Sequence, residues 1–450
     1  MNRQEFLNKL FAAAAAAGIA ESEAYIAGGE NTSVEILDGQ IKEYSAAKSE
    51  GLCFRGVYEG RMGYASTEEM DEDAIEMLVN GVRENAALLE TDDDETIFEG
   101  AKEYAPLDQY CEETASMPAS EMIERAKKME ERAKAADPHV QRMDGVSFDT
   151  LVREKRIVNS RGLDISYRSA LAAASVAPIV ADNGRVNFDY EMRCAFRKDE
   201  IPDDELADRA VAKAVAGLNA ESVPSGSYRV VLRNDAARTL LSTFAGVFSA
   251  ENARKGLSLL KDREGERVAA ECVTIIDDPL LKDGFASVPF DAEGVPTFTK
   301  TVVEKGVLKT LLHNRTTAKA MGKETTGNAA KAGYAAPVRV APTNFFIEPS
   351  QMSFDELLEE VGNGLLITSM MGMHSGANQI SGDFSLGAKG FLIENGKIGR
   401  PVEQVTIASN FFDILKNIRH TASDLRFGYP GSTTIGSPAL DVSMISVAGK

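Results

Sequence analysis

Short stretches of alternating apolar and polar residues in the first quarter of the chain predict a helix, a group of antiparallel strands and a second helix. The opening helix places Phe6, Leu10 and Ala14 on one face. Strands are predicted over 33–37, 41–44, 52–58 and 62–65. Asp38-Gly39 suits a tight hairpin turn, because glycine tolerates a positive φ. The second helix begins near Asp71 and carries apolar residues at helical spacing: Ile75, Leu78, Val79, Val82, Ala86 and Leu89.

The same order of elements recurs in the next hundred residues. Ser120 caps a predicted helix, strands follow through residue 180, and Asn183-Gly184 predicts another hairpin. A helix after Pro202 completes this second unit. The tetrapeptides Ser-Glu-Gly-Leu at 49–52 and Ser-Arg-Gly-Leu at 160–163 add a short local match. These observations predict an internal duplication.

We therefore expect an α+β chain in which a duplicated helix–antiparallel-strands–helix N-terminal region precedes a β-rich antiparallel C-terminal domain. The predicted boundaries are 1–95 for the first unit, 96–117 for an acidic linker, 118–222 for the second unit and 223–450 for the C-terminal domain. That last domain contains two clear helices. One runs from Asn234 to about Ala250, and the other starts at Ser353, which forms a capping box with Glu356.

The charge balance limits the classes of partner. The 450 residues contain 49 Lys plus Arg against 69 Asp plus Glu, a formal net charge of −20, which disfavours contact with nucleic-acid phosphates or anionic lipid. No stretch approaches the roughly 18 apolar residues of a membrane span, and the apolar start is better explained by a packed helix than by a cleaved signal. The four cysteines lie far apart, which favours a reduced, cytoplasmic protein.

Familiar catalytic patterns are scarce. None of the four histidines has a histidine partner at i+4 or i+5, although three of them fall in the C-terminal domain and could meet in space. The glycine-rich run 362–390 is explained equally well by turns and bulges or by backbone amides left free to meet a peptide. The acidic pairs Asp277-Asp278 and Asp291/Glu293 could act as general acids or bases, but their Pro and Gly neighbours favour turns.

The C-terminal domain carries the most specific residues. The runs that matter are Gly372-Met373-His374-Ser375-Gly376-Ala377-Asn378, Ser381-Gly382-Asp383-Phe384-Ser385-Leu386-Gly387, Phe290-Asp291-Ala292-Glu293-Gly294-Val295-Pro296 and Ser446-Val447-Ala448-Gly449-Lys450. With them the chain resembles the TldD/PmbA family, and most closely its PmbA branch, also called TldE. The family was first described as modulators of DNA gyrase and is classed among metallopeptidases. The resemblance implies a complex in which TldD and TldE subunits pair, with zinc held by a His-Glu-x-x-x-His helix and a C-terminal cysteine of TldD.

This sequence departs from that zinc motif. Aligned with the motif, Ser242 stands at the first histidine, Thr243 at the glutamate and Val247 at the second histidine. No cysteine follows Cys272. A hydroxyl is a poor replacement for imidazole, and valine has no lone pair to offer a metal. We therefore expect no catalytic residue and no metal on this chain, with zinc on a TldD-like partner.

The resemblance thus favours a TldE/PmbA-like, non-catalytic subunit of a heteromeric metallopeptidase that acts on unfolded or precursor peptides. His374, Ser375, Asn378 and Asp383 are candidates for peptide binding or for the subunit interface. The chain could pair with itself when the catalytic subunit is absent. Two other functions stay open: a non-proteolytic binding protein that modulates a target such as gyrase, or an autonomous hydrolase that uses other groups, such as His374 with Ser375 or Ser385.

Overall fold

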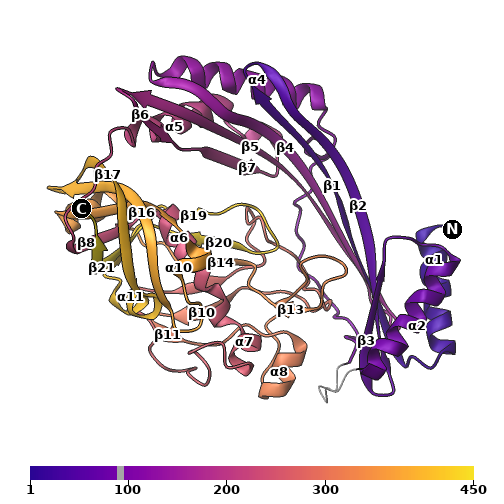
Figure 1. The fold of residues 1–450 in the computed structure, drawn as a ribbon. Helices are drawn as coiled ribbons and strands as arrows, with labels where there is room; N and C mark the ends of the chain where they lie inside the picture. Colours follow the sequence, from indigo (N-terminus) through magenta and orange to yellow (C-terminus); the bar gives the residue numbers. More distant parts are fainter. Residues whose placement is uncertain (89–95) are drawn as a thin grey trace.

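The computed structural model describes residues 1–88 and 96–450. A long, curved, seven-stranded antiparallel sheet arches over a compact C-terminal domain, which lies against its concave face (Figure 1). The order of the sheet is β3-β2-β1-β4-β5-β6, and β7 also pairs with β5. The strands are β1 (Glu21–Leu37), β2 (Gln40–Tyr58), β3 (Arg61–Thr67), β4 (Val140–Asn159), β5 (Asp164–Asp182), β6 (Arg185–Phe188) and β7 (Glu191–Ala195).

The strands are longer than the sequence patterns predict, because neighbouring predicted segments merge. The segments 41–44 and 52–58 are parts of β2, a strand of 19 residues. Both predicted hairpins are confirmed. Asp38 and Gly39 have φ values of 51° and 73°, and Asn183 and Gly184 have 47° and 82°, the left-handed backbone that such turns require.

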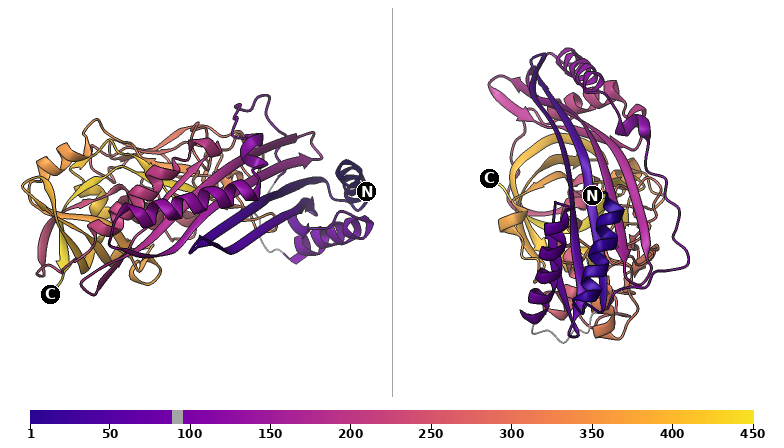
Figure 2. Two further views of the ribbon diagram at one scale, coloured as in Figure 1. Left: turned by 90° about the horizontal axis from the view of Figure 1, so that it is seen from above. Right: turned by 90° about the vertical axis from the view of Figure 1, so that its right-hand side faces the viewer.

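Helices cover the convex face of this sheet at its two ends (Figure 2). At one end α1 (Arg3–Ala16) and α2 (Glu72–Leu88) bury Phe6, Leu10 and Leu78 against Leu52 and Phe54. At the other end α4 (Ala119–Ala136) and α5 (Asp203–Ala216) enclose a second apolar cluster. The short helices α3 (Glu112–Ala115) and η1 (Lys198–Glu200) lie near α4, since Lys198 contacts Thr114, Glu121 and Arg125. Leu89 and the acidic stretch 91–95 lie outside the described residues.

The two N-terminal units join through their central strands. β1 pairs with β4 in one uninterrupted register from Glu23 opposite Asn159 to Ile36 opposite Val146. Each unit therefore supplies part of one continuous sheet rather than a separate layer. The domain boundaries assigned from the sequence stay predictions. The pairing of β1 with β4 shows that the first two units share a backbone hydrogen-bond network.

Two larger sheets form the C-terminal domain. In one, β17, β16, β15, β8 and β21 form a closed ring, because β21 pairs with both β8 and β17; β18 extends β21. The other has the order β11-β10-β9-β14-β20-β19, and a hairpin of β12 and β13 lies apart from both. Pairing is antiparallel except between β8 and β15 and between β14 and β20. The strands are β8 (Gly226–Leu232), β9 (Ile275–Asp277), β10 (Lys300–Glu304), β11 (Val307–Leu308), β12 (Ala329–Ala330), β13 (Arg339–Val340), β14 (Asn344–Ile347), β15 (Gly364–Met371), β16 (Asp383–Glu394), β17 (Lys397–Asn410), β18 (His420–Thr421), β19 (Arg426–Phe427), β20 (Thr434–Ser437) and β21 (Leu440–Ala448).

Short helices pack between these sheets: α6 (Asn234–Phe244), η2 (Ala245–Phe248), α7 (Ala250–Arg254), α8 (Arg315–Met321), α9 (Phe354–Val361), α10 (Met373–Gly376) and α11 (Phe411–Asn417). The predicted capping box of Ser353 and Glu356 is confirmed at the start of α9. The helix predicted from Asn234 to about Ala250 is too long, since α6 ends at Phe244 and a 3-10 turn follows. None of the helices in the described residues is long and apolar enough to cross a bilayer.

Candidate functional site

The residues predicted to stand at the zinc-motif positions lie where α6 ends and η2 begins. Ser242 is exposed. The Thr243 hydroxyl donates a hydrogen bond of 2.9 Å to the carbonyl of Thr239, one turn earlier in the helix. Val247 is 2% exposed and belongs to the main apolar core of the domain. The structure therefore brings Ser242 and Thr243 to a partly open helix face, while Val247 points into packed hydrocarbon.

A network of ion pairs connects α6 to the first sheet. Asp235, in the first turn of α6, lies 3.0 Å from Arg238 Nε and 3.5 Å from the Arg426 guanidinium. Burial alone would raise the pKa of Asp235, but the two guanidinium groups lower it below its usual value. Arg426 also donates a 2.7 Å hydrogen bond to Glu191 of β7, which is 2% exposed and lies 3.1 Å from Lys213 Nζ. The position of α6 beneath the sheet therefore depends on charges from both parts of the molecule.

The four residues expected to contact a peptide or a partner lie in the connection from β15 to β16 and at the first residue of β16. His374 and Ser375 are exposed on α10. The side-chain oxygen of Asn378 accepts hydrogen bonds from the backbone amides of Ile380 and Ser381, at 3.0 and 3.2 Å. Asn378 therefore stabilises the turn, and the binding role of this group of residues stays a prediction.

Asp383 is the first residue of β16, and its carboxylate is also hydrogen-bonded to other side chains of the protein. It accepts hydrogen bonds from Asn410 Nδ2 at 2.9 Å and Ser381 Oγ at 2.8 Å, and these bonds, led by that from Asn410, lower its pKa. Asp383 is thus held as a carboxylate that joins the turn to the end of β17.

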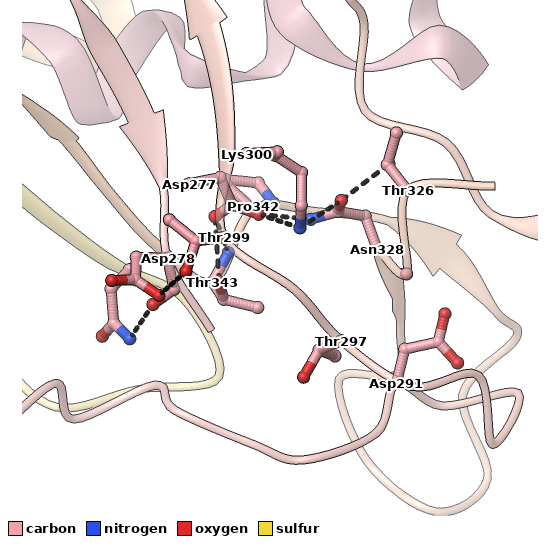
Figure 3. A network of polar contacts seen from close by, with 12 residues as sticks. Asp277, Asp278, Asp291, Thr297, Thr299, Lys300, Thr326, Asn328, Pro342 and Thr343 are labelled. Atoms are coloured by element: carbon pink, nitrogen blue, oxygen red, sulfur yellow. Dashed lines mark hydrogen bonds and ion pairs between the residues drawn. The ribbon is translucent and has the colours of Figure 1, made fainter. Parts of the chain in front are cut away.

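A buried polar network occupies the second C-terminal sheet (Figure 3). Asp277 on β9 is fully buried and lies 3.0 Å from Lys300 Nζ of β10. Asn328 donates to Asp277 at 2.7 Å and accepts from Lys300 at 3.1 Å, and the Thr343 amide donates to Asp277 at 2.7 Å. The turn interpretation was therefore wrong for Asp277. Because both charges are fully partnered, the network is suited to holding strands together rather than to transferring protons.

Asp278 and Asp291 do organise turns. Asp278 accepts a hydrogen bond from the Leu280 amide at 3.0 Å. Asp291 accepts from the amides of Glu293 and Val295 at 2.8 and 3.0 Å, and from that of Ala329 at 3.1 Å. Burial, followed by the nearby charge of Glu293, raises the pKa of Asp291. In Figure 3 Asp291 lies apart from the Asp277–Lys300 network.

The histidines do not assemble. His313 is fully buried, and neither ring nitrogen has a hydrogen-bond partner. Burial lowers its pKa, so the ring is neutral at pH 7. Across residues 1–88 and 96–450, no group of three or more His, Cys, Asp or Glu side chains is arranged to hold a metal ion.

Family models describe this whole architecture. The C-terminal domain of PmbA/TldA metallopeptidases matches residues 225–449, their central domain matches 112–218 and their domain 1 matches 22–86. The chain belongs to the PmbA/TldD family.

Relatives within the PmbA/TldD family are similar over most of their length. The metalloprotease PmbA homolog of Haemophilus influenzae is 30% identical over 406 residues, which cover 88% of this chain and 86% of the relative. The metalloprotease PmbA of Escherichia coli O157:H7 is 28% identical over 400 residues, covering 87% and 85%.

Solved structures have the same fold. A Thermotoga maritima protein named as a modulator of DNA gyrase aligns with a TM-score of 0.91 at 33% identity, covering 99% of this chain and 100% of that one. TldE from Thermococcus kodakarensis aligns with a TM-score of 0.88 at 21% identity, covering 99% and 100%, and at that identity the likeness shows the fold alone.

Proposed function

We propose that this chain is the TldE-like, non-catalytic subunit of a heteromeric zinc metallopeptidase that acts on unfolded or precursor peptides. A TldD-like partner supplies the zinc and the activated water, and this chain completes the chamber around the substrate. The single observation that carries the proposal is the chemistry of α6 and η2, where the family's metallopeptidase motif would lie.

The side chains at these positions do not fit zinc. Structural and catalytic zinc sites use imidazole, thiolate or carboxylate ligands. Here the three positions offer the exposed hydroxyl of Ser242, the hydroxyl of Thr243 already donated to Thr239, and the buried isopropyl group of Val247. The lack of any cysteine after Cys272 supports the same reading.

The proposal includes a cytoplasmic location. Cys53, Cys111, Cys194 and Cys272 are all unpaired thiols, which supports a reducing compartment. It also includes the absence of direct contact with DNA, which the net charge of −20 supports.

The decisive experiment compares the lone chain with a co-expressed pair. The purified chain should contain far less than one zinc per molecule by mass spectrometry and should leave an unfolded fluorogenic peptide uncut. Co-expression with a TldD-like chain that carries His-Glu-x-x-x-His should give a complex that binds zinc and cleaves the peptide. One tightly bound zinc per lone chain would contradict the proposal.

Matched variants separate the two subunits. In the complex, Ser242→Ala and Thr243→Ala in this chain should leave kcat within about twofold, whereas replacing the motif glutamate of the partner with glutamine should remove activity. A loss of activity on Thr243→Ala, with the complex still assembled, would mean that this chain takes part in the chemistry.

A further inference from the structure

Two cations on the concave face of the first sheet lack counterions. In β4 the register with β5 is uninterrupted from Gly145 to Val158, so alternate side chains point to the same face. Ile157 packs in a cluster with Phe290 and Ala292 of the C-terminal domain, which fixes that face as the concave one. Arg153 and Lys155 therefore also face the C-terminal domain, and we call them the Arg153–Lys155 pair.

The interactions of this pair are few. Arg153 Nη1 donates one hydrogen bond of 3.2 Å, to the carbonyl of Gly431. Within the described part of the chain, the Lys155 ammonium makes no hydrogen bond, and neither cation has a carboxylate within 4.0 Å. Arg156, the next residue on the opposite face, contrasts with them, because it binds both carboxylate oxygens of Asp164, at 2.9 and 2.7 Å.

Both cations are nevertheless removed from bulk water. Surrounding protein lowers the pKa of Lys155 to about 8, with a further contribution from the charge of Arg153, while Asp291 acts in the opposite direction. Burial also lowers the pKa of Arg153. Both side chains still keep part of their surface exposed. Two like charges that are desolvated, unpaired and still accessible are a costly arrangement, which an incoming anion would relieve.

The residues beside the pair on the neighbouring strands are small. Ala27 lies opposite Lys155, and Gly29 lies opposite Arg153 on β1. On the far side of β1 the same row continues with Gly51 and Ser49 of β2. These residues have small side chains or none, and Gly29 and Ser49 keep exposed surface. Near Gly51 this row is covered by the ring of Tyr334 of the C-terminal domain, which lies 2.4 Å from where a Cβ on Gly51 would stand. The accessible part of the row is therefore at Gly29 and Ser49, beside Arg153.

We propose that Arg153 and Lys155 form a binding site for one carboxylate group of a peptide that lies along the concave face of the first sheet. The guanidinium offers paired N–H donors and the ammonium adds a point charge, a combination that matches a carboxylate. The ligand class rests on the proposed handling of peptides, whereas the site itself does not depend on zinc or on a partner subunit.

The test uses the full-length chain without a partner, so its result is independent of peptidase activity. Lysines are labelled by reductive ¹³C-methylation, and the Lys155 signal is assigned as the one lost in Lys155→Arg. The probes are N-acetyl-Ala-Ala with a free C-terminal carboxylate, its C-terminal amide, and N-acetyl-Ala-Glu-Ala amide, whose carboxylate is on a side chain.

N-acetyl-Ala-Ala should shift the Lys155 signal and raise its pKa, and it should bind at least tenfold more tightly than its amide. A response to the glutamate probe as well would assign the site to any peptide carboxylate, and a response to the first probe alone would assign it to C-termini. Equal binding of acid and amide, or an unmoved Lys155 signal with every probe, would overturn the proposal.

Variants give a second readout. Lys155→Met and Arg153→Gln should each weaken binding of N-acetyl-Ala-Ala by tenfold or more. Arg156→Gln, on the same strand but the opposite face, should leave it within twofold. Unchanged affinity of Lys155→Met for N-acetyl-Ala-Ala would overturn the proposed site. If the lone chain bound the carboxylate but the complex with a TldD-like chain had no peptidase activity, that result would count against the proposed function alone.

Discussion

Replacing Lys155 with methionine should stabilise the folded chain at neutral pH. Methionine keeps the length and most of the volume of the lysine stem but removes a charge that the fold desolvates and leaves without a counterion. Most substitutions in a folded domain destabilise it, so a gain here would be diagnostic of the unpaired cation.

The size of the gain follows from the pKa of this lysine. Its value falls from 10.5 to about 8. At about 1.4 kcal/mol per pH unit, that difference corresponds to an upper limit of about 3.5 kcal/mol. Because the side chain is partly exposed, solvent screening reduces the expected gain to about 1–2 kcal/mol.

The lowered pKa of Lys155 also determines how the stability gain changes with pH. Folding disfavours the protonated amine, so the penalty in the wild type is fully present below pH 8 and fades as the pH rises towards 10.5. The difference in unfolding free energy between Lys155→Met and wild type should therefore be largest at pH 7 and small at pH 10. Urea unfolding followed by circular dichroism at both values measures it.

Lys48 provides the matched control for this measurement. It lies on β2 of the same sheet, but its side chain is 77% exposed and pairs with Glu30. Lys48→Met should produce no comparable gain at pH 7. A destabilised Lys155→Met, or a gain that is the same at pH 7 and pH 10, would refute the reasoning about desolvation.

Three further predictions concern buried charges and an uncharged histidine. Lys300→Met leaves the buried carboxylate of Asp277 without its cation, so it should lower the free energy of unfolding, measured with urea, by about 3–5 kcal/mol. Adding Asp277→Asn should recover much of this loss, and no recovery would argue against the pairing of Lys300 with Asp277. His313 is kept neutral by burial, so the stability of the wild type should be fully present above about pH 6.5 and fall as the pH decreases. The unfolding temperature of His313→Leu should change less than that of the wild type from pH 7.5 to 5, and an equal change in both proteins would contradict this. Glu191→Gln weakens the contact with Arg426 and should speed amide hydrogen exchange in β7 and β19, while unchanged exchange there would mean that other contacts hold the two parts together.

Local signals in the sequence predicted the local structure well. The Asp38-Gly39 and Asn183-Gly184 dipeptides determine a backbone geometry that few other residues adopt, so both hairpins could be read directly. The capping box at Ser353 is equally local. Residues 45–49 of β2, by contrast, are exposed or half-buried, so no alternation of burial marks them as strand, and the long strand looked like two short ones.

Contacts between distant segments could not be read from the sequence. The pairing of β1 with β4 joins residues more than a hundred positions apart, and periodicity says which face is buried but not which strand lies alongside. The same limit explains why Asp277 was taken for a turn residue, since its cation comes from Lys300 on another strand. The family resemblance identified α6 as the decisive helix, but only the packing showed that Val247 points into the core.

The candidate site residues also divide into those that a local motif indicates and those that depend on contacts with a distant part of the chain. His374, Ser375, Asn378 and Asp383 were singled out because they lie in one motif; they lie close together in the chain at the start of β16, and their binding role stays a prediction. The proposed Arg153–Lys155 pair was not singled out in the sequence, because charged residues that alternate along a strand normally indicate a solvent-facing side. Here that side is covered by a second domain, and nothing in the pattern of β4 marks this.

The closed ring of the C-terminal domain constrains how the protein is made in the cell. β21 fills the gap between β8 and β17, and it is formed by residues 440–448, more than two hundred positions after its partner β8. A growing polypeptide on the ribosome must therefore hold β8 and β17 with open edges until β21 has been synthesised. Such edges readily pair with other strands, so the emerging domain depends on chaperones or on fast final closure to escape aggregation.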